Sequence, residues 1–347
     1  MKKKMLANGS LMTIGTNRLL IGYGERTWLK EPDFKQPCFY FPDFFLKDTS
    51  PWCVHESYLE TSVDALLMQL ADCKGSTIVW KNTSKNVFEK AFGDLRQRFN
   101  KGELQKAVPF VFETSTEKMT PELLKHCLAS ALNYAHTHDV YLYGFWDQEQ
   151  GMLGVTPEML FRYEKNGENI LETMACAGTY RTEQGSTQQL LNDSKELSEH
   201  QLVVAGIEEA LQPFGSVAID PMRILSLPGL AHLVTPMRAK LSTDVAFESI
   251  VRALHPTPAL GASPKEPGME WLKQYQTLIN RERFGAPVGS VCKGANMNCV
   301  VGIRNVQWNA EGMKIGAGCG VVPESQLENE WQEIEAKLQS VKGILGL

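Results

Sequence analysis

Long apolar runs are missing from this sequence. It contains no stretch of about 18 consecutive apolar residues, the length that a helix needs to cross a bilayer. The basic start at Lys2, Lys3 and Lys4 is soon interrupted by Asn8 and Gly9, so no signal-peptide pattern follows it. These absences predict a cytoplasmic protein.

Paired cysteine motifs and a strong net charge are missing as well. The eight cysteines are scattered without a Cys-x-x-Cys pair, which predicts reduced thiols rather than a disulfide framework or a zinc site. The formal net charge of −5 gives no reason to expect nucleic acid or an anionic membrane as a partner.

No low-complexity segment or long linker divides the 347 residues, so we expect one large domain over 1–347. Periodicity predicts helices at 59–72, 85–99, 121–137, 187–212, 244–254 and 327–343. Strand patterns cover 10–24, 104–114, 140–147, 151–179 and 298–322, with a hairpin turn at 309–312. This mixture favours an α+β fold over a doubly wound sheet.

Two Glu-x-x-Glu pairs, Glu196/Glu199 and Glu330/Glu333, carry the clearest chemical signal. On a helical wheel each pair lies on or beside an apolar stripe. Carboxylates in such positions are costly unless they are paired, hydrogen-bonded or metal-bound. Four of them on two helices predict a site for a hard cation such as Mg²⁺. The competing interpretation is two solvated helix faces, with Glu333 and Lys337 as a surface pair.

Ten fragments in collinear order over residues 100–347 resemble the chorismate-utilising enzymes, a family that includes isochorismate synthase, salicylate synthase, anthranilate synthase component I and aminodeoxychorismate synthase component I. They are LQKAV, LGVTPEML, ACAGTYR, KELSEHQLVV, LAHLVTP, LHPTPALGASP, INRERFGAPVG, VVGIRNV, GAGCGVVP and ENEWQEIEAKL. Residues 1–100 are divergent and resemble the family only loosely. The resemblance implies an α+β domain in which two orthogonally packed β-sheets are flanked by helices.

The resemblance also implies that one Mg²⁺ bridges the glutamate pairs and the C1 carboxylate of chorismate. Glu199 and Glu333 would bind the ion directly, while Glu196 and Glu330 would act through water or support the direct ligands. Other positions would contact the substrate's carboxylates or ring. They are Gly178, Thr179, His255, Arg304, Gly318, Gly320 and Lys337. For His255 a place in the core, and for Arg304 an exposed strand position, are the alternatives.

Two positions distinguish the reaction types within the family. Enzymes that add water carry a lysine where ammonia-using enzymes carry a glutamine, and this chain has Lys106 there. Aminodeoxychorismate synthases carry a nucleophilic lysine where this chain has Ala177, so we expect no amination and no glutamine amidotransferase subunit. A solvent-facing lysine at the end of a strand is the alternative interpretation of Lys106.

The resemblance then implies that Lys106 deprotonates the water that attacks C2, while Glu158 protonates the departing C4 hydroxyl. Enclosure would lower the pKa of Lys106 and raise that of Glu158 towards useful values. An ordinary turn glutamate is the alternative for Glu158.

The leading hypothesis is a Mg²⁺-dependent isochorismate synthase, an isomerase of the hydroxymutase type. Salicylate synthase, a non-catalytic chorismate-binding protein and a di-iron carboxylate bundle remain alternatives. Pro109 and Gly316 depart from the family pattern, and Val234 does not settle whether isochorismate is released or converted to salicylate. The resemblance leaves menaquinone synthesis and siderophore synthesis as alternative uses of the product.

Overall fold

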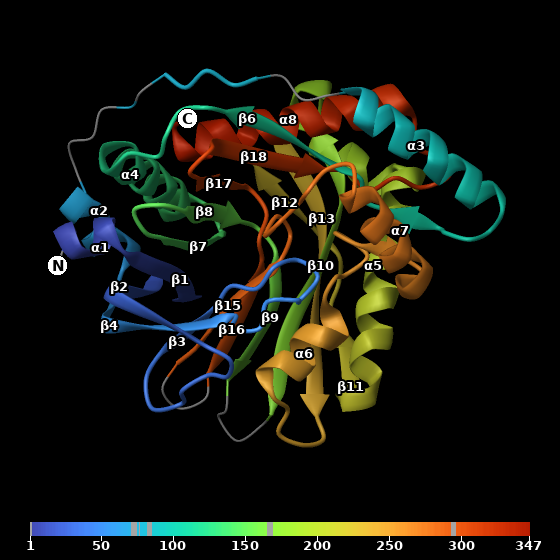
Figure 1. The fold of residues 1–347 in the computed structure, drawn as a ribbon. Coiled ribbons are helices and arrows are strands. Elements are labelled where there is room, and N and C mark those ends of the chain that lie inside the picture. The colour runs from blue at the N-terminus through green and yellow to red at the C-terminus, as the bar shows by residue number, and fades with distance from the viewer. Residues whose placement is uncertain (1, 71–74, 76, 82–84, 165–168, 293–295) are drawn as a thin grey trace.

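A computed structural model describes residues 2–70, 75, 77–81, 85–164, 169–292 and 296–347, which form a mixed α+β domain (Figure 1). The helices are α1 Lys2–Ala7, α2 Val63–Leu70, α3 Lys85–Asn100, α4 Pro121–Thr137, α5 Ser194–Leu211, α6 Phe247–Leu254, α7 Lys265–Gln276 and α8 Leu327–Leu345. None of these helices combines the length and the apolar character that a membrane span requires.

The strands outnumber the helices. They are β1 Gly9–Gly15, β2 Arg18–Leu29, β3 Cys38–Tyr40, β4 Trp52–Thr61, β5 Lys106–Ala107, β6 Phe110–Ser115, β7 Tyr141–Trp146, β8 Gly151–Thr156, β9 Met159–Glu164, β10 Ile170–Arg181, β11 Gly215–Ile219, β12 Arg223–Leu227, β13 Leu230–Leu241, β14 Ala262–Ser263, β15 Pro287–Val291, β16 Met297–Val301, β17 Asn305–Asn309 and β18 Gly312–Gly318. The predicted α+β class is confirmed, and the divergent first 100 residues supply four of these strands.

The strands do not form the two separate sheets that we expected. Sixteen of them make one continuous antiparallel sheet in the order β11-β13-β10-β9-β16-β15-β3-β4-β2-β1-β7-β8-β17-β18-β6, with β12 paired to β13. Only β5 and β14 form a second, two-stranded sheet among the described residues. In Figure 1, β10 and β13 run down the view, whereas β17 and β18 run across it. The sheet therefore changes direction without a break in its hydrogen bonding.

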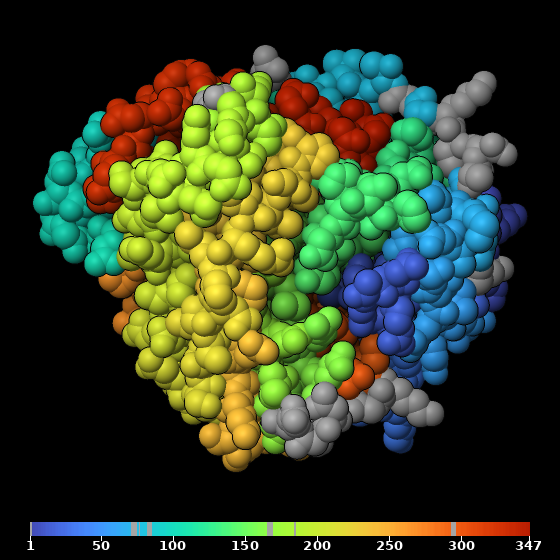
Figure 2. All heavy atoms as spheres, turned by 180° about the vertical axis from the view of Figure 1, so that it is seen from behind, coloured from blue at the N-terminus to red at the C-terminus, as the bar shows by residue number. Residues whose placement is uncertain are grey.

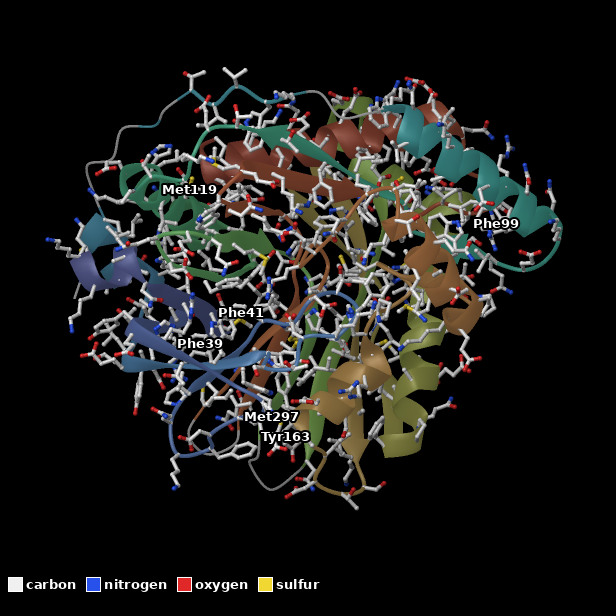
Figure 3. The ribbon with its side chains drawn as sticks, viewed as in Figure 1. Phe39, Phe41, Phe99, Met119, Tyr163 and Met297 are labelled. Atoms are coloured by element: carbon white, nitrogen blue, oxygen red, sulfur yellow. The ribbon has the colours of Figure 1, made fainter. Side chains whose placement is uncertain are left out.

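The short strand β3 connects the two parts of the sheet, the part that ends in β15 and the part that begins with β4. It pairs with β15 on one side and with β4 on the other, so backbone groups at this seam find strand partners and no edge is exposed. Phe39 and Phe41 lie close together at the seam, with ring centroids 6.2 Å apart (Figure 3).

At the lower end of the same view, Tyr163 and Met297 are cross-strand neighbours in β9 and β16.

Helices α5 and α8 lie against different parts of the sheet. The apolar stripe of α5, which includes Val203 and Ile207, is buried with Met237 of β13. The stripe of α8, which includes Ile334 and Leu338, joins a separate core with β6 and β18. Seen from behind, the N-terminal strands lie beside the β7 region, as the β1–β7 pairing requires (Figure 2).

Two predicted elements are interrupted at capping or proline residues. The expected helix over 187–212 opens as a 3₁₀ turn at Thr187–Asn192, and α5 begins only at Ser194 because the Asp193 carboxylate accepts from the backbone N–H groups of Lys195 and Glu196. The expected strand over 104–114 is split into β5 and β6, because Pro109 cannot donate to a strand ladder.

One other prediction needs correction, and one helix was missed. The expected helix over 59–72 is strand β4 up to Thr61, and α2 begins at Val63. Helix α7 was not predicted, because Pro267 and Gly268 in its first turn are typical of a loop; proline is tolerated there since the first N–H groups of a helix have no internal partner.

Candidate active site

One cavity gathers most of the predicted site residues. It is enclosed by β10 and β18, by α5 and α8, and by the loops before β9, β15 and β17. The predicted residues that line it are Glu158, Gly178, Thr179, Glu199, Arg304, Gly318, Gly320 and Lys337. Val108, Leu260, Phe284 and Ile303 add apolar surface, and Ala177 presents only a methyl group. The cavity thus places charged groups around a partly apolar floor, an arrangement that suits a small anionic ring compound.

Glu196 and Glu199 project from the first two turns of α5 and are buried. Gly178 adopts a positive φ of 79° at an irregularity in the β10–β13 pairing, a conformation that suits glycine. The turn directs the backbone N–H of Thr179 to Glu196 Oε2, with an N–O distance of 2.7 Å. In this structure that N–H, which we expected to contact the substrate, holds a glutamate.

Lys195 lies among the glutamates, and the sequence interpretation overlooked it. Its Nζ is 2.8 Å from Glu196 Oε1, 3.0 Å from Glu330 Oε1 and 3.5 Å from Glu199 Oε2. The Glu199 contact is an i,i+4 pair and was visible in the sequence, whereas the Glu330 contact joins α5 to α8 and was not.

Glu333 pairs with Lys337 one turn further along α8, at 2.6 Å, and the Lys337 ammonium also donates to the Gly318 carbonyl at 2.9 Å. Burial would raise the pKa of Glu333, but Lys337 and Lys195 outweigh it and hold the pKa at about 2. The pair is therefore enclosed and ionised, not the surface pair of the alternative interpretation.

Lys106 is fully buried, so the solvent-facing alternative is wrong. Its Nζ lies 3.2 Å from Glu199 Oε1 and donates to the Pro258 carbonyl at 2.5 Å. Lys106 does not line the cavity itself but lies directly behind Glu199 and Gly320. A Cβ atom on Gly320 would come within 1.9 Å of Glu199 Oε1 and 2.7 Å of Lys106 Cε, so glycine is required for this close approach.

Glu158 lies in the turn between β8 and β9 and is almost fully buried. Burial raises the pKa of its carboxyl group to about 8, although Lys106 and Lys337 act in the opposite direction. At neutral pH most of the Glu158 population therefore carries a proton, as a general acid must.

Arg304 was expected within a strand, but it occupies a left-handed turn with φ of 56° just before β17. This conformation is costly for a residue other than glycine, and it turns the guanidinium into the cavity. The Arg304 Nη2 atom lies 3.4 Å from His232 Nε2, and His232 Nδ1 lies 3.2 Å from Thr179 Oγ1. Burial, together with Arg304 and Lys337, lowers the pKa of His232 to about 3, so the imidazole is neutral and can accept from Arg304.

His255 does not line the cavity, contrary to our expectation of ring contact. Its Nε2 hydrogen-bonds the Phe44 carbonyl at 2.7 Å, and its ring packs edge-on against the Phe44 ring. The core alternative therefore describes this histidine.

Gly316, where the family pattern has an aromatic residue, is explained by its neighbours. A Cβ atom there would lie 2.7 Å from Phe112 and 2.8 Å from Phe284. The Phe112 and Phe284 rings occupy the space beside the glycine, and Phe284 forms part of the cavity wall.

The carboxylates fit a hard cation in chemistry. Glu330 Oε2 is buried without a hydrogen-bond partner among the described residues. Burial and the nearby Glu199 carboxylate raise the pKa of Glu196 to about 8, a sign of crowded negative charge. In the described ranges, however, no three His, Cys, Asp or Glu side chains converge closely enough to hold a metal. The Lys195 ammonium lies where they would converge.

A family model described as "Chorismate binding enzyme" matches residues 56–346. The salicylate biosynthesis isochorismate synthase of Pseudomonas aeruginosa is 32% identical over 203 residues, which are 56% of this chain and 41% of that protein. Isochorismate synthase EntC of Escherichia coli is 30% identical over 204 residues, or 56% and 51% of the two chains. The chain thus matches about half the length of these curated relatives.

A solved structure, the menaquinone-specific isochorismate synthase MenF of Escherichia coli, superposes with a TM-score of 0.81. The superposition covers 99% of this chain and 90% of that one at 18% sequence identity, which shows a common fold. A helical di-iron bundle is excluded, because α5 and α8 pack on this extended sheet rather than on one another in a bundle.

Proposed function

Because this chain belongs to the chorismate binding enzyme family, we propose that it converts chorismate to isochorismate with Mg²⁺ as cofactor. The observation that carries the proposal is the contact between Lys106 and Glu199, which sets a buried lysine directly behind a carboxylate at the cavity wall. The two curated relatives described above are isochorismate synthases, which supports the same reaction, although an anthranilate synthase component 1, from Saccharolobus solfataricus, also matches at 27% identity over 225 residues. We further propose that residues 1–347 act as one chorismate-binding domain.

The charges around the cavity favour joint binding of a dianion and a divalent cation. Five carboxyl groups and four basic groups line the cavity or lie directly behind its wall: Glu158, Glu196, Glu199, Glu330, Glu333, Lys106, Lys195, Lys337 and Arg304. Chorismate brings two carboxylates into this enclosed site, and Mg²⁺ would supply two positive charges that offset them. Glu199 and Glu333 would hold the ion, supported by Glu196 and Glu330.

Other residues of the chain would bind the substrate and transfer the protons. Arg304, held by His232, and Lys337 lie in the cavity wall, where they would bind substrate carboxylates. Lys106, as the neutral amine, would accept a proton from the water that forms the new C2–O bond. Glu158 would donate its proton to the C4 hydroxyl, which leaves as water while the ring double bonds shift. One water is consumed and one released, so the reaction is an isomerisation.

Two residues, one behind the cavity wall and one in it, argue against amination. Lys106 stands where ammonia-using relatives carry glutamine, and Ala177 offers no amine that could attack the substrate. We therefore propose that the enzyme works without a glutamine amidotransferase subunit.

Incubation of the purified protein with chorismate and Mg²⁺, followed by chromatography, tests the proposal. We expect isochorismate as the product, and we expect a chelator to abolish its formation. Salicylate together with pyruvate would instead identify a salicylate synthase. Anthranilate formed only with ammonia would exclude both, and tight chorismate binding without turnover would identify a non-catalytic protein.

A further inference from the structure

The ammonium group of Lys195 has the surroundings of a bound cation. Oxygen atoms of Glu196, Glu330 and Glu199 lie 2.8, 3.0 and 3.5 Å from its Nζ, and they come from both α5 and α8. Its three N–H donors therefore face three different carboxylates. Lys195 joins the two helices whose glutamates would hold the metal.

Glu199 is shared between two lysines, one on each of its oxygens. Lys106 contacts Oε1 and Lys195 contacts Oε2. Lys106 is fully buried and also donates a hydrogen bond to the Pro258 carbonyl, so its side chain is confined. The side chain of Lys195 is 18% exposed and projects from the first turn of α5. A lysine stem is flexible, so Lys195 can swing its ammonium group into solvent.

The three lysines around the four glutamates leave one carboxylate oxygen without a partner. Lys337 contacts Glu333 and Lys106 contacts Glu199, so Lys195 is the lysine that faces Glu196 and Glu330. Glu330 Oε2 stays without a hydrogen-bond partner among the described residues although Glu330 is only 2% exposed. A divalent ion at the same place would offset more of the charge. It could not share the position with Lys195, because two cations about 3 Å apart repel strongly where solvent is excluded.

We propose that Lys195 is a built-in counter-cation that occupies the metal position in the metal-free enzyme and must leave it before a divalent ion binds. This inference rests on the metal site of the proposed function. Lys195 stabilises the free enzyme by keeping the glutamates neutralised, and by competition it weakens metal affinity. Metal binding and the movement of Lys195 are then one linked equilibrium.

Metal titrations of the purified apoprotein test the proposal without an activity measurement. Mn²⁺ binding is followed by electron paramagnetic resonance and Mg²⁺ binding by calorimetry, for the wild type, K195M and K195R. K195M keeps the length of the side chain without its charge, and we expect it to bind both ions at least about tenfold more tightly. K195R keeps the charge, and we expect affinity no higher than that of the wild type. K101M, at an exposed lysine, is the matched control and should bind as the wild type does.

Equal or weaker Mn²⁺ binding by K195M would overturn the role of Lys195 while leaving the metal site in place. A wild-type protein that binds no Mn²⁺ would overturn the metal site and this inference with it. If K195M does not fold, a crystal structure of the wild type with Mg²⁺ decides. Lys195 Nζ should then have left Glu196 and Glu330, and an unchanged position beside a bound ion would refute the proposal.

Discussion

Lys106 Nζ lies 3.2 Å from Glu199 Oε1, at a point where the lysine is fully buried and the glutamate side chain is only 8% exposed. The proposed base and a proposed metal ligand are therefore in direct contact. A substitution at either residue affects the other, because removal of one partner leaves the other as an uncompensated buried charge. We therefore expect proton transfer and metal binding to be coupled through Glu199.

Replacement of Lys106 by glutamine should stop water addition. The amide keeps a polar group near Glu199 but cannot accept a proton, so we expect kcat to fall by about 10²-fold or more. Steady-state kinetics gives the rate, and calorimetry with chorismate shows whether the substrate still binds. A variant that binds chorismate and keeps a kcat within about twofold of the wild type would show that Lys106 is not the base.

Glu158 should give the reaction an upper pH limit. A general acid works in its protonated form, and the pKa of Glu158 is raised to about 8, mainly by burial. We expect kcat to decline as the pH rises through about 8, and E158Q to be nearly inactive across the whole range. The wild-type pH profile, measured at saturating chorismate and Mg²⁺, checks this. An undiminished kcat well above pH 8 would assign the acid to another group.

The same carboxyl group should make stability depend on pH. The unfolded chain releases the Glu158 proton near its ordinary pKa of 4.5, while the folded chain keeps it up to about 8. Between these values the folded state binds more protons, so the free energy of unfolding falls as the pH rises, by up to about 1.4 kcal/mol per pH unit.

E158Q cannot titrate at this position and should lose that dependence. Denaturant unfolding of the metal-free protein at about pH 5 and about pH 8 should show E158Q gaining stability relative to the wild type at the higher pH. E324Q, at an exposed glutamate, should follow the wild type. Parallel curves for the wild type and E158Q would mean that the Glu158 pKa is not raised.

The sequence predicted those parts of the site that periodicity or a local motif encodes. The apolar stripes predicted all four glutamates on or beside core-facing surfaces, and the structure buries them. Lys106 was singled out by the resemblance to enzymes that add water to chorismate. Lys195 was missed because its contact with Glu330 joins residues far apart in the chain. His232 was missed because only the fold brings Arg304 beside its imidazole.

In the fold, too, elements marked by local sequence patterns were predicted, whereas contacts between distant parts of the chain were not. Helices α4 and α8 were predicted almost to the residue, since a proline or an apolar stripe marks them. The continuous sheet was not predicted, because it depends on the pairing of Tyr40 with Gly289 across most of the chain. No local pattern encodes that pairing.

Gly320 should be required for the close contact between Lys106 and Glu199 behind the cavity wall. In G320A the new methyl group would lie 1.9 Å from Glu199 Oε1 and 2.7 Å from Lys106 Cε, so the two partners would have to separate. We expect Mg²⁺ affinity and kcat to fall together, each by about tenfold or more, since one displaced carboxylate serves both.

G343A provides the matched control for G320A, because a Cβ atom at Gly343, on the exposed side of α8, meets nothing within 4 Å. It should leave activity unchanged and raise stability by about 0.5–1 kcal/mol, as alanine favours a helix interior over glycine. Calorimetric Mg²⁺ titration, kinetics and thermal unfolding of both variants make the comparison. If G320A kept both Mg²⁺ affinity and kcat, the close approach of Lys106 and Glu199 would be irrelevant to the reaction.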